Sequence, residues 1–128
     1  MKVLIIDNDL DEINLIQEGL DGQDFEVFDA DDREDAIDKL RENTPEIILA
    51  DFNMPEFGGM DLINNLLAAD VEIYPYIIFI TEKNSEKEVI EVLGPIPGDF
   101  LFRPTDEAEL KARMAIAERT PAPAGAGP

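Results

Sequence analysis

Short apolar runs alternate along the chain with stretches in which apolar residues recur at helical spacing. The most continuous run is Ile47–Ala50, which leads directly into the acid Asp51. Apolar runs this short and rich in β-branched residues are typical of a strand buried on both faces. Asn53–Pro55 then predicts a turn. Asp51 is therefore expected at the carboxyl end of a central strand, where open α/β sheets place their ligand sites.

Four further segments are expected to be strands. The residues of Phe25–Phe28 alternate only weakly, which suits an edge strand. Lys2–Asp7 and Tyr76–Thr81 contain continuous apolar runs, and Asp99–Pro104 is expected to be a further short strand. Each continuous run ends in or just before a polar residue. The four segments are Lys2–Asp7, Phe25–Phe28, Tyr76–Thr81 and Asp99–Pro104.

Five helices are expected between and after these strands, because apolar residues recur there three and four positions apart. Ser85 and Glu88 have the spacing of a capping box at the start of the fourth helix. The apolar stripes are Ile13, Ile16 and Leu20; Ala36, Ile37 and Leu40; Leu62, Ile63, Leu66 and Leu67; Val89, Ile90 and Leu93; and Leu110, Met114 and Ala117.

Strict alternation of strands and helices with short loops predicts an α/β fold. Its sheet should be doubly wound and parallel, with helices on both faces. The 128 residues fit one domain, expected over residues 1–119. Residues 120–128 are rich in Pro, Ala and Gly, so we expect a flexible tail or the start of a linker.

Composition narrows the chemistry. The chain has no Cys and no His, which excludes thiol chemistry, a histidine base and the usual zinc ligands. Ten basic and 30 acidic residues give a net charge of −20, which argues against direct binding of nucleic acid or an anionic membrane by this domain. Residues 1–15 have the pattern of neither a signal peptide nor a membrane span, and a cytoplasmic location is expected.

Polar side chains follow four of the five predicted strands. In a parallel sheet they meet at one edge, so we expect them to lie together. Clustered carboxylates need a neutralising cation, and oxygen ligands favour Mg²⁺. A hydroxyl and a guanidinium would complete a set suited to phosphoryl transfer onto a carboxylate; the alternative is a capped sheet edge with an Arg–Asp ion pair. These residues are Asp7, Asn8, Asp9, Asp51, Thr81 and Arg103.

With these residues, the chain resembles the receiver domain of two-component response regulators, from residue 1 to about residue 119. IIDND matches the acidic cluster after the first strand of that family, and LADFNMP matches the strand with the phospho-accepting aspartate. FIT matches the strand that ends in the switch hydroxyl, and DFLFRP matches the strand with a switch aromatic and a basic residue before proline. The joint order and spacing of the four motifs are specific.

The resemblance implies a flavodoxin-like (βα)5 fold with strand order 2-1-3-4-5. It implies that Asp51 accepts a phosphoryl group from the histidine of a sensor kinase or from a phosphotransfer protein. Asp7 and Asp51, with the backbone carbonyl of Asn53, would hold Mg²⁺, and Asn8 could add an amide oxygen. The only expected chemistry is phosphorylation and dephosphorylation of the domain itself, so the chain is not expected to be an enzyme acting on other substrates.

The resemblance also implies a switch. Thr81 would move onto the phosphoryl oxygen, and Phe100 would turn inward behind it. Arg103 stands where the family has lysine, which pairs with the phosphoryl group. The Arg103–Pro104 bond would be cis.

Three residues depart from the family pattern. Asn8 replaces the second acid, which implies weaker metal binding. Arg103 replaces the lysine with a wider, planar fork. Glu82 stands where the family favours a small residue, and its charge could obstruct a phosphoryl dianion.

Two alternatives remain at the level of sequence. One is a degenerate receiver that binds partners without phosphorylation. The other is a haloacid-dehalogenase-type phosphatase, in which Asp7 is the nucleophile and Asp9 the general acid. The second leaves Asp51 unexplained.

The family resemblance implies an output domain or a homodimer, formed through the last two helices and the last strand. Such a dimer should need basic residues, because the chain carries so much negative charge. The last helix offers Lys111, Arg113 and Arg119, for which a plain solvated helix face near the helix dipole is an equal alternative.

Overall fold

The computed structural model describes residues 1–69, 74–94 and 96–120. Strands and helices alternate as predicted, and a short 3-10 turn, η1 (Lys83–Ser85), precedes the fourth helix. The strands are β1 (Lys2–Ile6), β2 (Glu26–Ala30), β3 (Ile47–Asp51), β4 (Tyr76–Thr81) and β5 (Gly98–Phe102). The helices are α1 (Leu10–Leu20), α2 (Arg33–Asn43), α3 (Gly59–Ala68), α4 (Glu86–Leu93) and α5 (Glu107–Arg119).

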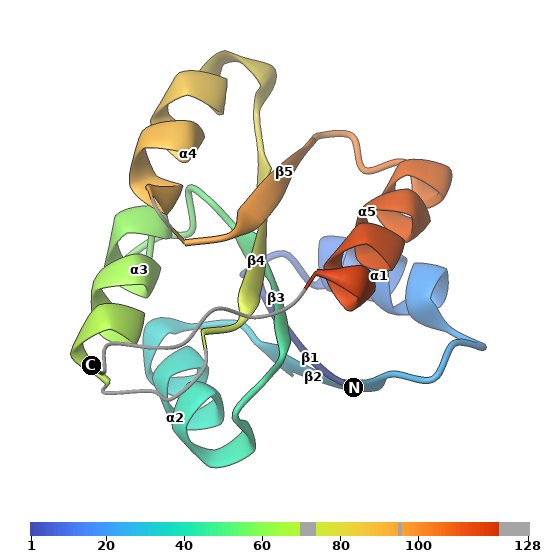
Figure 1. The fold of residues 1–128 in the computed structure, drawn as a ribbon, viewed down its shortest axis with the longest axis horizontal. Coiled ribbons are helices and arrows are strands. Elements are labelled where there is room, and N and C mark those ends of the chain that lie inside the picture. The colour runs from blue at the N-terminus through green and yellow to red at the C-terminus, as the bar shows by residue number, and fades with distance from the viewer. Residues whose placement is uncertain (70–73, 95, 121–128) are drawn as a thin grey trace.

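The strands form one parallel sheet in the order β2-β1-β3-β4-β5, which confirms the predicted topology. Figure 1 shows α1 and α5 on one face of this sheet and α2, α3 and α4 on the other. β5 ends at Phe102 rather than at Pro104, so Arg103 lies just beyond the strand. Every strand therefore points its carboxyl end at the same edge of the sheet.

The core has two layers, one on each face of the sheet. All residues of β3 and β4 are buried, as their uninterrupted apolar sequences require. Alternate residues of each strand serve the two layers: Ile48 packs toward α2, α3 and α4, and Leu49 packs toward α1 and α5. The edge strand β2 is only partly buried, which explains its weaker sequence pattern.

Aspartates cap three helices. The side chains of Asp9, Asp32 and Asp106 each accept a hydrogen bond from a backbone N–H in the first turn of α1, α2 and α5. The capping box predicted for Ser85 is wrong: Ser85 is the N-cap residue of α4, but its side chain makes no capping hydrogen bond. The predicted cis bond between Arg103 and Pro104 is confirmed.

The expected tail at 120–128 lies, from residue 121 onward, outside the described residues. In residues 1–69, 74–94 and 96–120, no helix is long and apolar enough to cross a bilayer.

Phe52 fixes the loop that follows β3. Its ring packs edge-on against Phe79 of β4, with the ring centroids 5.2 Å apart. The backbone N–H of Gly59 donates to the carbonyl of Phe52, and a Cβ added at Gly59 would lie only 2.5 Å from two atoms of the Phe52 ring. Gly59 is therefore needed for close approach, and this contact ties α3 to the residue after Asp51.

Gly59→Ala should lower the free energy of unfolding by about 1–3 kcal/mol, the usual cost of overpacking a close contact. Gly58→Ala is the matched control, because a Cβ at Gly58 meets only the Phe52 carbonyl oxygen, at 3.4 Å. It should cost less, about 1 kcal/mol or below, from the change at the helix N-cap. Urea unfolding of both variants measures the difference; equal losses would show that the Phe52 ring yields freely.

Candidate functional site

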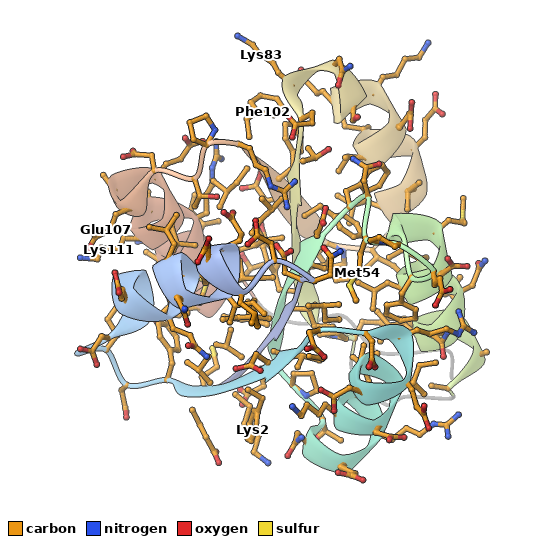
Figure 2. All side chains as sticks on the ribbon, turned by 180° about the vertical axis from the view of Figure 1, so that it is seen from behind. Lys2, Met54, Lys83, Phe102, Glu107 and Lys111 are labelled. Carbon is orange, nitrogen blue, oxygen red and sulfur yellow. The ribbon has the colours of Figure 1, made fainter. Side chains whose placement is uncertain are left out.

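The polar residues at the strand ends do meet at one edge of the sheet. Figure 2 shows Lys2, at the start of β1, at the opposite end of the molecule from Phe102, at the end of β5. Asp7, Asp51 and Thr81 are the buried polar residues at the carboxyl-terminal edge. In a fold whose core is otherwise apolar, three buried polar side chains in one place mark this edge as the candidate functional site.

Both acids are held by backbone hydrogen bonds. The N–H of Asp9 donates to Asp7 Oδ1 at 3.0 Å, and the N–H of Asn53 donates to Asp51 Oδ1 at 3.0 Å. Each carboxylate thus accepts from the residue two positions further on, as an Asx turn does. The same backbone turns that end β1 and begin the loop after β3 therefore set the positions of the two carboxylates.

Arg103 bridges the two acids. One guanidinium nitrogen, Nη2, lies 3.4 Å from Asp7 Oδ2 and 3.3 Å from Asp51 Oδ1. Its backbone N–H donates to the carbonyl of Thr81 at 3.0 Å, which extends the β4–β5 pairing by one residue. Arg103 is thus fixed at its backbone by β4 and at its tip by β1 and β3.

Burial and neighbouring charges both shift the pKa values of Asp7 and Arg103. Burial raises the pKa of Asp7, and the nearby negative charge of Asp51 raises it further; the bond from Asp9 and the charge of Arg103 lower it without reversing the shift. Burial alone lowers the pKa of Arg103, but the neighbouring carboxylates more than offset this and raise it. The guanidinium therefore stays charged, and Asp7 is the acid that carries the cost of burial.

Thr81 is the second notable feature of the edge. Its side chain is fully buried, and its Oγ1 has no hydrogen-bond partner among the described residues. An unsatisfied buried hydroxyl costs about 1–3 kcal/mol. This hydroxyl, at the end of β4 next to Arg103, is available to a group that enters the site.

The donor set fits a magnesium ion. The carboxylates of Asp7 and Asp51 are brought together, and a backbone carbonyl follows at Asn53; all are hard oxygen donors. In the described part of the chain, no group of three or more Asp, Glu, His or Cys side chains is placed to hold a metal. Two carboxylates suffice for Mg²⁺, which usually keeps several water ligands.

Three other predicted residues lie around this centre. Asn8 and Glu82 are exposed, and Glu82 precedes η1 at the end of β4. Phe100 is half-buried against the core layer beneath α2, α3 and α4, and its ring lies 5.4 Å from that of Phe102. The structure thus places the predicted switch aromatic at the surface of the core, two strands away from Asp51.

The sequence analysis missed one pair. Thr105 Oγ1 donates to Glu12 Oε1 at 2.6 Å, which joins the loop after β5 to the first turns of α1. Thr105 follows the Arg-Pro pair, and this position was the only signal available. Neither residue belongs to a motif, and 93 positions separate them along the chain.

Two of the three basic residues of α5, Lys111 and Arg113, are partnered within the chain. Lys111 pairs with Glu107 at 3.0 Å, one turn away, and Figure 2 shows both on the outer side of this helix. Arg113 pairs with Asp99 of β5 at 3.0 Å and with Glu109 at 3.6 Å. These exposed and half-exposed pairs are weak, so they can be exchanged for contacts with another chain at little cost.

Comparison with known proteins gives relatives among bacterial transcriptional regulators. Transcriptional regulatory protein PrrA of Mycobacterium bovis is 31% identical over 88% of this chain, and KdpE of Staphylococcus aureus is 29% identical over 92%. The matches cover 48% and 50% of those proteins, so the chain spans about half the length of these relatives.

Solved structures agree on the fold. The receiver domain of AraT, a response regulator from Geobacillus stearothermophilus, matches 91% of this chain with a TM-score of 0.79 and 25% identity, and 92% of its own chain is covered. Chemotaxis protein CheY4 of Vibrio cholerae matches 91% of this chain and 97% of its own, with a TM-score of 0.76 and 20% identity. The flavodoxin-like fold expected from the family resemblance is thus confirmed.

A family model decides the assignment. The model of the response regulator receiver domain matches residues 3–115, nearly the whole described chain. The four motifs that carry the resemblance fall at the ends of β1, β3, β4 and β5. The chain belongs to the response regulator receiver domain family, whose members are signalling domains of two-component systems.

Proposed function

We propose that this receiver domain is phosphorylated on Asp51 by a sensor histidine kinase or a phosphotransfer protein. The observation that carries the proposal is the convergence of Asp7, Asp51, Thr81 and Arg103 at one edge of the sheet. In the transfer, a carboxylate oxygen of Asp51 forms a bond to phosphorus as the bond between phosphorus and the donor nitrogen breaks. Charge neutralisation around the incoming group is the main demand of such a reaction.

Asp7 and Asp51, with the carbonyl of Asn53 and an oxygen of Asn8, are the proposed ligands of Mg²⁺. The metal would supply positive charge for the phosphoryl oxygens. Asp7 is the side chain best suited to gain from it, because burial has already raised its pKa and a cation offsets the cost of its charge. The exposed Asn8 has an amide in place of a carboxylate, so we expect modest metal affinity.

Arg103 and Thr81 are the proposed phosphoryl-binding side chains. Arg103 contacts Asp51 already, and its guanidinium can donate to a phosphoryl oxygen. The buried hydroxyl of Thr81, which has no hydrogen-bond partner within residues 1–69, 74–94 and 96–120, would gain a hydrogen bond from the same group. Phe100 is the proposed second switch residue, which would move inward when Thr81 moves toward Asp51.

The proposed output lies outside this domain. The relatives are named as transcriptional regulators and are about twice as long as the match, which supports an attached output domain or a separate partner. A homodimer through α4, β5 and α5 would use Lys111, Arg113 and Arg119, exchanging the weak pairs of the first two. A cytoplasmic location is part of this proposal, and the absence of nucleic-acid contacts by this domain stays a prediction from charge.

A second candidate is a degenerate receiver that binds partners without phosphorylation. The observation in its favour is Arg103, which already satisfies both Asp7 and Asp51 without a metal. The phosphatase alternative is not carried forward, since the chain belongs to the receiver family.

Incubation with Mg²⁺ and a small acyl phosphate donor should add one phosphoryl group to the intact mass of the protein. Asp51→Asn should abolish the increment, because the amide cannot accept the group. Asp38→Asn, an exposed change on α2, is the matched control and should label like the wild type. No increment in the wild type, together with no spectral response to beryllofluoride and Mg²⁺, would establish the degenerate receiver instead.

Glu82→Ala should speed labelling by up to about tenfold, because it removes a negative charge from the end of β4 beside the phosphoryl site. Glu91→Ala removes an equally exposed carboxylate from α4 and serves as the control. The rate constants come from intact mass against time. If both variants label at the wild-type rate, Glu82 does not obstruct the site.

Asp7→Asn should raise the free energy of unfolding at neutral pH in metal-free buffer, because burial raises the pKa of Asp7 and penalises its charged form. The folded protein binds this proton at a higher pH than the unfolded chain, whose pKa is near 3.8. The wild-type penalty therefore grows as pH rises above 3.8 and is complete above the raised pKa.

Urea unfolding of both proteins from neutral pH down to about pH 4 tests this expectation. The advantage of the variant should shrink as pH falls, and Mg²⁺ should stabilise the wild type more than the variant. A variant that is less stable than the wild type at neutral pH would mean that the bond to Arg103 outweighs burial.

A further inference from the structure

Glu12 and Thr105 connect two segments that each adjoin the site. Glu12 lies in α1, the helix that begins three residues after Asp7. Thr105 lies two residues after Arg103, in the short connection between β5 and α5. Their hydrogen bond, at 2.6 Å and partly buried, is a direct side-chain contact between these segments. It therefore lies where it can set the distance between Arg103 and Asp7.

The position of Arg103 needs such a support. Its backbone is tied to β4 by one bond, from its N–H to the carbonyl of Thr81, and β5 has already ended at Phe102. Its Nη2 contacts with Asp7 and Asp51, at 3.4 and 3.3 Å, are long for charged hydrogen bonds. A small shift of the connection would lengthen them further. α1 and α5 pack together at this side of the sheet (Figure 1), so a bond to α1 gives the connection a rigid partner.

The charge of Glu12 also acts on the site. The carboxylate of Glu12, like those of Asp51 and Asp7, interacts favourably with the guanidinium charge of Arg103. Glu12 thus attracts the guanidinium from the side of α1 while its oxygen holds Thr105. The hydrogen bond and the charge favour the same placement of Arg103.

We propose that the hydrogen bond between Glu12 and Thr105 is a clamp that positions Arg103 for phosphoryl transfer to Asp51. Glu12 is a positioning residue: it acts through Thr105 and Arg103 and does not itself touch the phosphoryl group. The expected effect of the clamp on the rate of Asp51 labelling rests on the proposed function, whereas its expected effect on the position of Arg103 rests on the geometry alone. Breaking the clamp leaves Asp51 intact but lets Arg103 move.

Thr105→Val removes the hydroxyl with little change of shape. The initial rate of Asp51 labelling at saturating donor and Mg²⁺ should fall about tenfold, within the loss of up to roughly 100-fold that a displacement of about 1 Å can cause. Thr105→Ser keeps a hydroxyl and should restore the rate to within about twofold of wild type. Thr120→Val is the matched control, because Thr120 Oγ1 also donates a hydrogen bond, to the Ile116 carbonyl, far along α5.

A double variant distinguishes one shared interaction between Glu12 and Thr105 from two independent local effects. Glu12→Ala should lower the rate about as much as Thr105→Val, and the two changes together should cost no more than either alone, because they break one interaction. Thermal unfolding of each variant gives its folded fraction at the assay temperature, and labelling rates are compared per folded protein. Additive losses, or a variant that is less stable but labels at the wild-type rate, would overturn the clamp and leave the pair a plain structural contact.

The Arg103 Nε–H signal in ¹⁵N-labelled protein gives a readout that needs no phosphorylation. It should shift or broaden in Thr105→Val and remain at its wild-type position in Thr105→Ser and Thr120→Val. An unchanged signal in Thr105→Val overturns the proposal. If the wild type takes no label at Asp51, the proposed function fails while this signal still decides whether the clamp positions Arg103.

Discussion

The contact of one guanidinium with two carboxylates is the interaction on which the site depends. Asp7 and Asp51 end neighbouring strands, so the sheet forces two buried negative charges to face each other. Arg103 lies within 3.4 Å of both and offsets their repulsion. Without a cation, either Asp7 would take up a proton or the ends of β1 and β3 would separate. The strand order β2-β1-β3-β4-β5 places the two carboxylates side by side, and the connection after β5 supplies the positive charge that offsets their repulsion.

That same connection links the charge centre to the rest of the molecule. The backbone of Arg103 bonds to Thr81 and so continues the pairing of β4 with β5. Thr81 carries the buried hydroxyl that no described residue satisfies, and Phe100 of β5 lies three residues before Arg103. A group bound at Asp51 would therefore affect, through few contacts, the strand and helices that the family resemblance assigns to signalling.

The departures from the family pattern have one theme, which is how the site balances its charges. An amide at Asn8 removes one negative charge, and one nitrogen of the Arg103 guanidinium reaches both remaining acids. Glu82 adds a negative charge at the surface of the same edge. The changes at Asn8 and Arg103 favour a resting state in which the chain itself balances the charge of the site. Mg²⁺ and a phosphoryl group would then have to compete with contacts that are already made.

The sequence alone determined the layers, the alternation of elements and the place of Asp51, because strand and helix periodicity depend only on which residues each face must bury. β3 is apolar throughout because both of its faces are covered, and this is visible without a structure. Only the tertiary structure showed that a single nitrogen of Arg103 reaches both acids, that the Thr81 hydroxyl has no hydrogen-bond partner in the described part of the chain, and that Thr105 bonds to Glu12. It also showed that Ser85, at the N-cap of α4, makes no side-chain capping bond and ends a 3-10 turn. Such contacts join side chains up to 96 positions apart, and their distances follow from how strands and helices pack, for which no local pattern exists.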